Sequence, residues 1–198
     1  MLYSDEDYRF VSETLASLTG GTSLDQMGML KPAAIQLSVV MLIYAKFFPE
    51  LNLENTLDVR IQSDATKELK PVIGLETIDS QIHVLFGVMN LQRQADVLLC
   101  GLKNMDKTVS EVSDLIKNYN QGNLNKLYDL LEDTSYCPST KEEKDAINKD
   151  RNNAWMLKLP EIMRGKSSFI AVGALHLAGE VGLLNLLEKA GYKVEPVI

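Results

Sequence analysis

The stretch "SSFIAVGALHLAGEVGLLNLLEKAGYKVEPVI", residues 167–198, decides the fold that the sequence predicts. Its apolar run at Ser168–Val172 is too short for a helix and has the composition of a buried strand. A helical pattern over Glu180–Ala190 follows, and Tyr192–Val197 has the pattern of another strand. The segment between these strands is long enough for a crossover helix, so we expect the two strands to be parallel.

Earlier segments supply helices and one more strand. Pro32–Phe48 is apolar and bounded by prolines, which predicts a largely buried helix, and Asn55 is placed to cap the next one. Val72–Leu75, in "KPVIGLET", is a short apolar run that predicts a buried strand. Thr140 and Glu143 have capping-box spacing and predict the start of a helix that runs past Arg151.

Together these segments predict an α/β (α+β) fold, a helix-rich domain around a small, mainly parallel sheet. We expect a single domain over residues 1–198. Within it we expect a helical lobe at about 79–165 and a strand–helix–strand unit at 168–197.

Composition limits the possible partners. The chain has 198 residues, is 45% hydrophobic and carries a formal net charge of −7, so it can bury a core but lacks the basic surface that nucleic acid requires. The most apolar stretch is interrupted by polar residues and is shorter than the ~20 residues of a membrane span. Cys100 and Cys137 lack metal-type spacing, and whether they pair stays open.

His176 follows the predicted strand Ser168–Val172, where ligands bind in open α/β sheets. Glu180 is expected in the first turn of the next helix, and Glu76 ends the other predicted strand. An imidazole beside a carboxylate can hold a metal or transfer protons. A hydrogen-bonded structural histidine explains the same position, and the H-x-x-x-E spacing also arises by chance. His83 has the pattern of an exposed helical residue.

The C-terminal stretch resembles the signature of the TraB/GumN family, which includes the Tiki proteins. The resemblance consists of an apolar strand, a G-x-x-H motif at Gly173–His176, a G-E pair, a helix and a closing strand. Other stretches agree in the same order, and the likeness covers about residues 25–198. They are "LKP" at 30–32, Leu57-Asp58, "GLET" with Gln81 five residues beyond Glu76, and "RN" at Arg151-Asn152.

This resemblance implies a metal-dependent hydrolase, since Tiki is described as a metalloprotease, with a fold like that of erythromycin-esterase and ChaN-type proteins. By it, His176 would hold the ion, and Glu76 or Glu180 would coordinate it or accept a proton from the attacking water. Arg151 would neutralise charge on the substrate oxygen. Gly173, Asn152 and Gln81 match further motif positions and are expected binding residues.

The sequence departs from the family pattern at its start. The family usually begins with a strand carrying a first G-x-x-H motif, and residues 1–30 contain no histidine. We therefore expect this chain to be the C-terminal two-thirds of a longer protein, trimmed or naturally shortened. Alone, it should bind a divalent metal (Mn²⁺, Co²⁺ or Zn²⁺) weakly, turn over little and associate with a second copy. The family likeness suggests an extracytoplasmic location.

A binding module without turnover is the alternative function. Amphipathic helices and eight methionines suit a lobe that sequesters a hydrophobic peptide or a small ligand, although such methionines more often fill a core. A third possibility is a chain that only self-associates.

Overall fold

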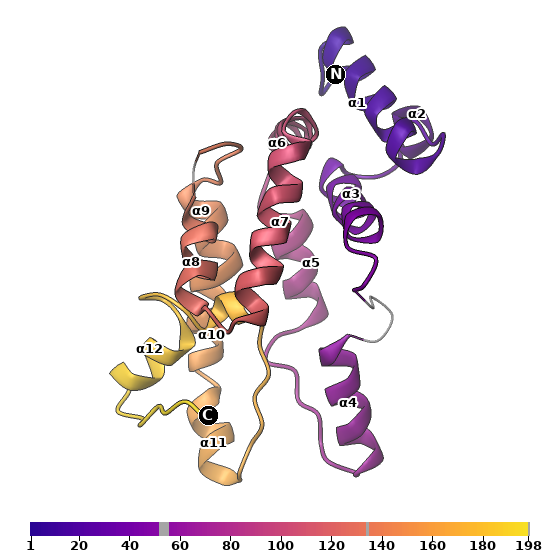
Figure 1. The fold of residues 1–198 in the computed structure, drawn as a ribbon. Coiled ribbons are helices and arrows are strands. Elements are labelled where there is room, and N and C mark those ends of the chain that lie inside the picture. The colour runs from indigo at the N-terminus through magenta and orange to yellow at the C-terminus, as the bar shows by residue number, and fades with distance from the viewer. Residues whose placement is uncertain (52–55, 134, 198) are drawn as a thin grey trace. The chain divides into compact units, whose positions relative to one another are not determined.

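The computed structural model describes residues 1–51, 56–133 and 135–197, and most of these residues are helical (Figure 1). The chain divides into two compact units. Unit 1 is formed by Met1–Ile73 and Asp79–Val109, and unit 2 by Gly74–Ile78 and Ser110–Ile198. Unit 2 is therefore discontinuous in sequence, because it takes in a short segment that interrupts unit 1.

The helices are distributed over both units. Those of unit 1 are α1 (Asp5–Thr19), α2 (Leu24–Met27), α3 (Pro32–Phe47), α4 (Leu57–Lys67), α5 (Ile78–Phe86, whose first residue falls in unit 2) and α6 (Leu91–Lys103). The helix α7 (Met105–Asn120) begins in unit 1 and ends in unit 2. Those of unit 2 are α8 (Leu124–Glu132), α9 (Lys141–Lys144), the π-helix η1 (Asp145–Lys149), α10 (Asp150–Met156), α11 (Leu159–Gly165), the 3₁₀ turn η2 (Ala174–His176) and α12 (Leu183–Lys189).

The predicted α/β fold is wrong, because no β-strand forms within the three described ranges. The runs predicted as strands, at 72–75, 168–172 and 192–197, have no regular secondary structure. A strand is stabilised by hydrogen bonds to a neighbouring backbone, and a local apolar pattern cannot supply that neighbour. Ile73 and Phe169 accordingly stay 67% and 80% exposed.

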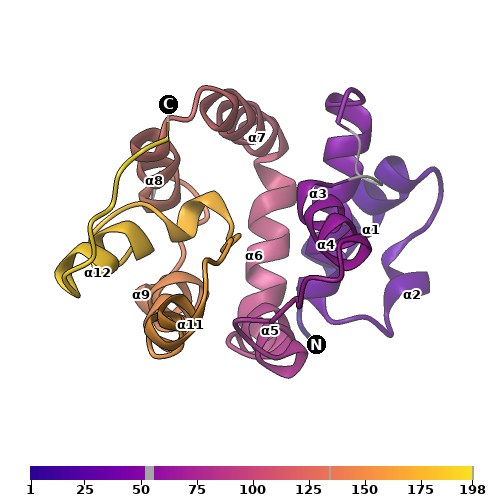
Figure 2. The ribbon, with the colours of Figure 1, turned by 90° about the horizontal axis from the view of Figure 1, so that it is seen from below.

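The core of unit 1 is made by α1, α3 and α6 (Figure 2). The predicted helix at 32–48 is confirmed as α3, which begins at Pro32 in the first helical turn. The predicted cap Asn55 lies outside the described residues. The side chains that fill this core are Val11 and Leu15 of α1, Ile35, Val39 and Ile43 of α3, and Ala95, Leu98 and Leu102 of α6.

The core of unit 2 is centred on Trp155, Leu159 and Leu183, which are all buried. Helix α10 lies against α12 here. Leu75, Ile170 and Val172, from two of the runs predicted as strands, pack on this core. The apolar side chains of these runs are therefore partly buried against helices and not against other strands.

A single helical stretch at 141–156 carries the middle of unit 2. The predicted capping box is confirmed, since the Thr140 hydroxyl accepts from the Glu143 backbone and the Glu143 carboxylate accepts from the Thr140 backbone. The stretch passes from α9 through the π-turn η1 into α10. Such π-turns occur often at functional sites.

A tight turn links His176 to α12, which begins at Leu183 and not at the predicted Glu180. Gly179 has a φ of +80°, and a Cβ there would lie 2.4 Å from the Tyr128 ring. At Gly182 a Cβ would lie 2.2 Å from the Ala178 carbonyl oxygen. Both positions require glycine, the first by conformation and space and the second by space alone.

No helix in the described part of the chain combines the length and the apolar character needed to cross a bilayer.

Candidate functional site

Four side chains of the 141–156 stretch share one face. Asn148, Arg151, Asn152 and Trp155 are spaced at i, i+3, i+4 and i+7, which brings them together on a helix. Asn148, Asn152 and Trp155 are buried, at 4%, 0% and 4% exposure. Buried polar side chains need hydrogen-bond partners, and this face finds them in residues 173–181.

His176 reaches this face from the 3₁₀ turn η2. Its backbone N–H donates to the Gly173 carbonyl oxygen at 2.9 Å, which closes the turn. His176 is 9% exposed, and its imidazole lies 4.5 Å from the Trp155 ring, centroid to centroid. The predicted position at the mouth of a sheet is wrong, since a helical turn and not a strand presents the ring.

Asn152 fixes the orientation of the imidazole. Its Nδ2 faces three oxygens, those of the Asn148 side chain and of the His176 and Val181 backbones, at 2.8, 3.1 and 2.7 Å. Because Nδ2 is the donor, Oδ1 is the acceptor, and it lies 2.8 Å from His176 Nδ1. The proton therefore sits on Nδ1, and Nε2 carries the lone pair.

Arg151 joins Glu76 to His176. Its Nε and Nη2 donate to the two Glu76 carboxylate oxygens at 3.1 and 2.6 Å. Its Nη1 lies 3.1 Å from His176 Nε2 and also donates to the Ile147 carbonyl at 3.2 Å. The Arg151 and Glu76 side chains are 23% and 12% exposed, so the ion pair is largely shielded from water. We call Glu76, Arg151, Asn152 and His176 the polar cluster.

The environment keeps His176 neutral. Burial, and then the charge of Arg151, lower the pKa of His176 from 6.5 to about 4, while the Glu76 carboxylate acts in the opposite direction. The ring is uncharged at neutral pH and offers Nε2 as an acceptor. The Arg151 guanidinium, which has only donors, donates to that nitrogen.

The polar cluster does not have the composition of a metal centre. A catalytic zinc-type site uses three protein ligands, and no group of three His, Cys, Asp or Glu side chains suited to a metal occurs among the described residues. Both ring nitrogens of His176 have partners, and Arg151 binds both oxygens of Glu76. The predicted ligands His176 and Glu76 thus lie in one site, but the guanidinium lies between them.

Of the other predicted site residues, Glu180 and Gln81 lie outside the polar cluster, and Gly173 lies next to it. Glu180 is exposed in the turn before α12, and its side chain makes no hydrogen bond to the polar cluster within the described part of the chain. Gln81 lies on α5 in unit 1. Gly173 contributes its carbonyl oxygen to the turn under His176, and its φ of −60° demands no special flexibility.

Asn148 and Trp155 belong to the site, but sequence reasoning missed them. Asn148 Nδ2 donates to the Leu175 carbonyl at 2.9 Å, and the Arg151 guanidinium carbon lies 5.0 Å from the Trp155 ring centroid. The sequence does contain a pattern that predicts this arrangement, because the polar and aromatic residues at 148, 151, 152 and 155 have the spacing of one helix face. Reading that spacing would have put both residues beside Arg151.

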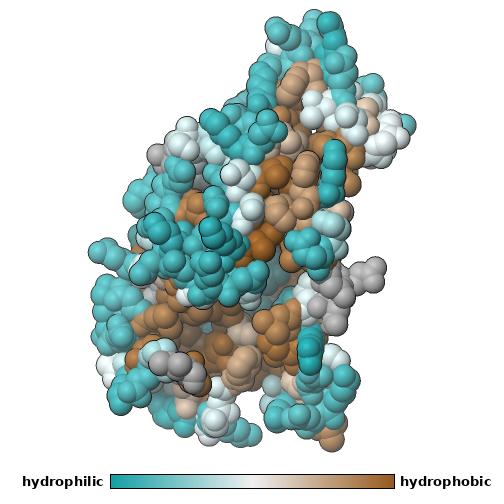
Figure 3. Space-filling model, in the orientation of Figure 1, coloured by the Kyte–Doolittle hydropathy of each residue, from teal (hydrophilic) through white to brown (hydrophobic). Residues whose placement is uncertain are grey.

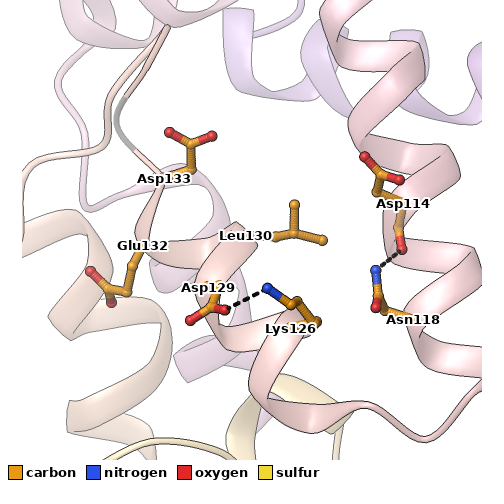
Figure 4. A pocket seen from close by; sticks show the side chains of 7 residues that line it. All are labelled: Asp114, Asn118, Lys126, Asp129, Leu130, Glu132 and Asp133. Carbon is orange, nitrogen blue, oxygen red and sulfur yellow. Dashed lines mark hydrogen bonds and ion pairs between the residues drawn. The ribbon is translucent and has the colours of Figure 1, made fainter.

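A separate cavity of about 580 Å³ lies between α7 and α8 in unit 2 (Figure 4). None of its lining residues belongs to the polar cluster. They are Asp114, Asn118, Lys126, Asp129, Leu130, Glu132 and Asp133. Lys126 pairs with Asp129, and Glu132 with Lys144, so part of this charge is compensated locally.

The model of the TraB/PrgY/gumN family matches residues 1–196. No curated protein and no solved structure shows significant similarity to the chain.

Proposed function

This chain belongs to the TraB/PrgY/gumN family, and on that basis we propose that it is a hydrolase of peptide or ester bonds with the polar cluster as its site. The observation that supports this most is the convergence of Glu76, Arg151 and His176. Contacts that span 75 and 25 positions in sequence bring a carboxylate, a fixed cation and a neutral imidazole within hydrogen-bond distance of one another.

In this proposal Arg151 binds the carbonyl oxygen of the substrate. Negative charge develops on that oxygen when water attacks, and a fixed guanidinium in a shielded site stabilises such charge. Glu76 holds two of the Arg151 nitrogens, and the third, Nη1, lies next to His176 Nε2. Glu76 is thus a positioning residue.

His176 Nε2 takes the proton of the attacking water. The charge of Arg151 helps to lower the pKa of this ring, so an oxyanion next to Arg151 raises the basicity of Nε2 when the proton must move. Asn152 keeps the other nitrogen protonated and the ring in place. The proton then passes from Nε2 to the leaving amine or alcohol.

A metal plays no part in these steps, because the polar cluster does not fit one. We propose that Mn²⁺, Co²⁺ or Zn²⁺ binds this chain weakly, through His176 Nε2 with Glu76. Such binding requires Arg151 to release both groups.

A non-catalytic binding module is the second candidate. The bonds within the polar cluster favour it, because both ring nitrogens of His176 and both oxygens of Glu76 have partners, as in a purely structural network. Calorimetry with hydrophobic peptides in the absence of metal tests this candidate, which predicts tight binding without turnover.

The test of hydrolysis compares two histidine variants. A set of peptides and p-nitrophenyl esters is incubated with the wild-type chain, with and without Mn²⁺, Co²⁺ or Zn²⁺. We expect His176→Ala to lose at least about 100-fold in kcat/KM, since a general base contributes about 10²–10⁴-fold. His83→Ala is the matched control, because His83 is the other histidine and is exposed on α5.

Equal activity of wild type and His176→Ala would remove the imidazole from the chemistry. Loss of activity in both histidine variants would point to general damage, and near-ultraviolet circular dichroism separates that case. Activity that appears only with added metal would overturn the metal-free steps.

A further inference from the structure

The Arg151 guanidinium lies between Glu76 and His176 and contacts both side chains. Three guanidinium nitrogens contact the two Glu76 oxygens and His176 Nε2 at 3.1, 2.6 and 3.1 Å. A carboxylate and an imidazole nitrogen are the ligands that Zn²⁺ and Co²⁺ accept, at about 2.0–2.2 Å from the ion. The Arg151 guanidinium therefore already binds the oxygen and nitrogen atoms that a metal ion would require.

The imidazole is otherwise prepared to bind a metal. Its Nδ1–H donates to the Asn152 oxygen at 2.8 Å, and metal-bound histidines usually make such a bond through their second nitrogen. The tautomer with the proton on Nδ1 leaves the lone pair on Nε2, the nitrogen that would coordinate a metal. The guanidinium prevents coordination in two ways, by filling the space and by its positive charge.

From this geometry we infer that the Arg151 guanidinium and a divalent cation exclude one another, and that removing the guanidinium makes Glu76 and His176 a divalent-metal site. This inference shares its site with the proposed function but does not depend on turnover. A measurement of metal binding without substrate separates the failure of one from the failure of the other.

The first experiment uses the wild-type chain and Co²⁺. The chain has two histidines, so nuclear magnetic resonance can follow the Hε1 signal of each ring separately. We expect the His176 signal to stay sharp at Co²⁺ concentrations that broaden the signal of exposed His83. Broadening of His176 at equal or lower Co²⁺ would overturn the inference.

The second experiment removes the guanidinium. Arg151→Met keeps an unbranched side chain over Trp155 but removes the three guanidinium nitrogens that contact Glu76 and His176 Nε2. We expect calorimetry to show Zn²⁺ and Co²⁺ binding at least tenfold more tightly than to wild type. The double variant Arg151→Met/His176→Ala should return to the wild-type affinity.

Arg164→Met is the matched control, since Arg164 is exposed at the end of α11 and its loss changes the net charge equally. Affinity in Arg151→Met no higher than in Arg164→Met would overturn the inference. If Arg151→Met does not fold, Arg151→Gln is used in its place, because glutamine keeps hydrogen-bond donors next to Glu76. The same tenfold criterion then applies.

Discussion

Asn152 decides what His176 can do. Its side chain is fully buried and its Nδ2 has three oxygen partners, so its oxygen faces Nδ1 and the Nε2 lone pair faces Arg151. A residue that the resemblance indicated only as a binding position therefore sets the tautomer of the imidazole. The chemistry assigned to His176 depends on this amide.

The depressed pKa of His176 predicts a pH dependence of stability. The folded ring has a pKa of about 4 and the unfolded ring about 6.5, so between these values only the unfolded chain binds the proton. The contribution of the neutral His176 ring to the free energy of unfolding is therefore present in full above about pH 6.5, and it is lost as the pH falls toward 4. We expect a loss of up to about 3 kcal/mol from this group.

Urea unfolding at pH 7 and pH 4.5, followed through the fluorescence of Trp155, measures this loss. Trp155 is the only tryptophan and packs beside His176 in the core of unit 2. Because carboxylates also titrate between these pH values, the loss of unfolding free energy is compared between wild type and histidine variants. His176→Gln should lose less stability than wild type, and His83→Gln should match wild type. An unchanged dependence in His176→Gln would contradict the prediction.

At the scale of elements, the turn between η2 and α12 holds His176 in position. Gly182→Ala would place a Cβ 2.2 Å from the Ala178 carbonyl oxygen and 2.4 Å from that of Leu177. Since backbone atoms cannot yield as a side-chain end can, we expect a loss of about 3 kcal/mol or more. Urea unfolding monitored by Trp155 fluorescence tests this loss.

Gly165→Ala is the control, because a Cβ at Gly165 meets nothing within 4 Å in the same unit. We expect its effect to stay within about 0.5 kcal/mol. Similar losses in the two variants would mean that the turn adapts and does not position His176 rigidly.

Several helices were predicted correctly from the sequence, whereas the predicted strands were wrong. The helix at 32–48 and the Thr140–Glu143 capping box follow from prolines, caps and period, which act within a few residues. The runs at 72–75 and 168–172 have strand-like composition, yet a ladder depends on a second segment that no local pattern reveals. The predicted sheet was wrong for that reason.

The candidate site was predicted in part, and through family likeness more than through pattern. Glu76, Arg151, Asn152 and His176 do meet, whereas Glu180 does not join them and Gln81 lies in unit 1. The sequence placed Glu180 in the first turn of a helix, but that helix starts three residues later. The direct Arg151–His176 contact links positions 25 apart and leaves no local signature.

At the scale of the whole molecule, many apolar side chains face solvent, and Figure 3 shows such areas on one face. Phe169 is 80% exposed, in a run whose backbone forms no ladder in the described chain. Unpaired backbone beside exposed apolar side chains favours association between copies. We propose that the chain forms dimers.

Sedimentation velocity over a range of protein concentrations tests this association. We expect the sedimentation coefficient of wild type to rise with concentration, and Phe169→Asp to shift the midpoint at least tenfold higher. Met29→Asp adds the same charge at a residue that is 99% exposed outside the helices, and it should resemble wild type. A wild-type coefficient independent of concentration would count against association.

Unit 2 is interrupted in sequence, and this has a consequence for synthesis on the ribosome. Glu76 is translated 75 residues before Arg151, and His176 follows 25 residues after that. At a translation rate of about 5–20 residues per second, Arg151 is synthesised about 4–15 s after Glu76. Most of unit 1 leaves the exit tunnel in this interval, so it can fold while the polar cluster still lacks two of its segments.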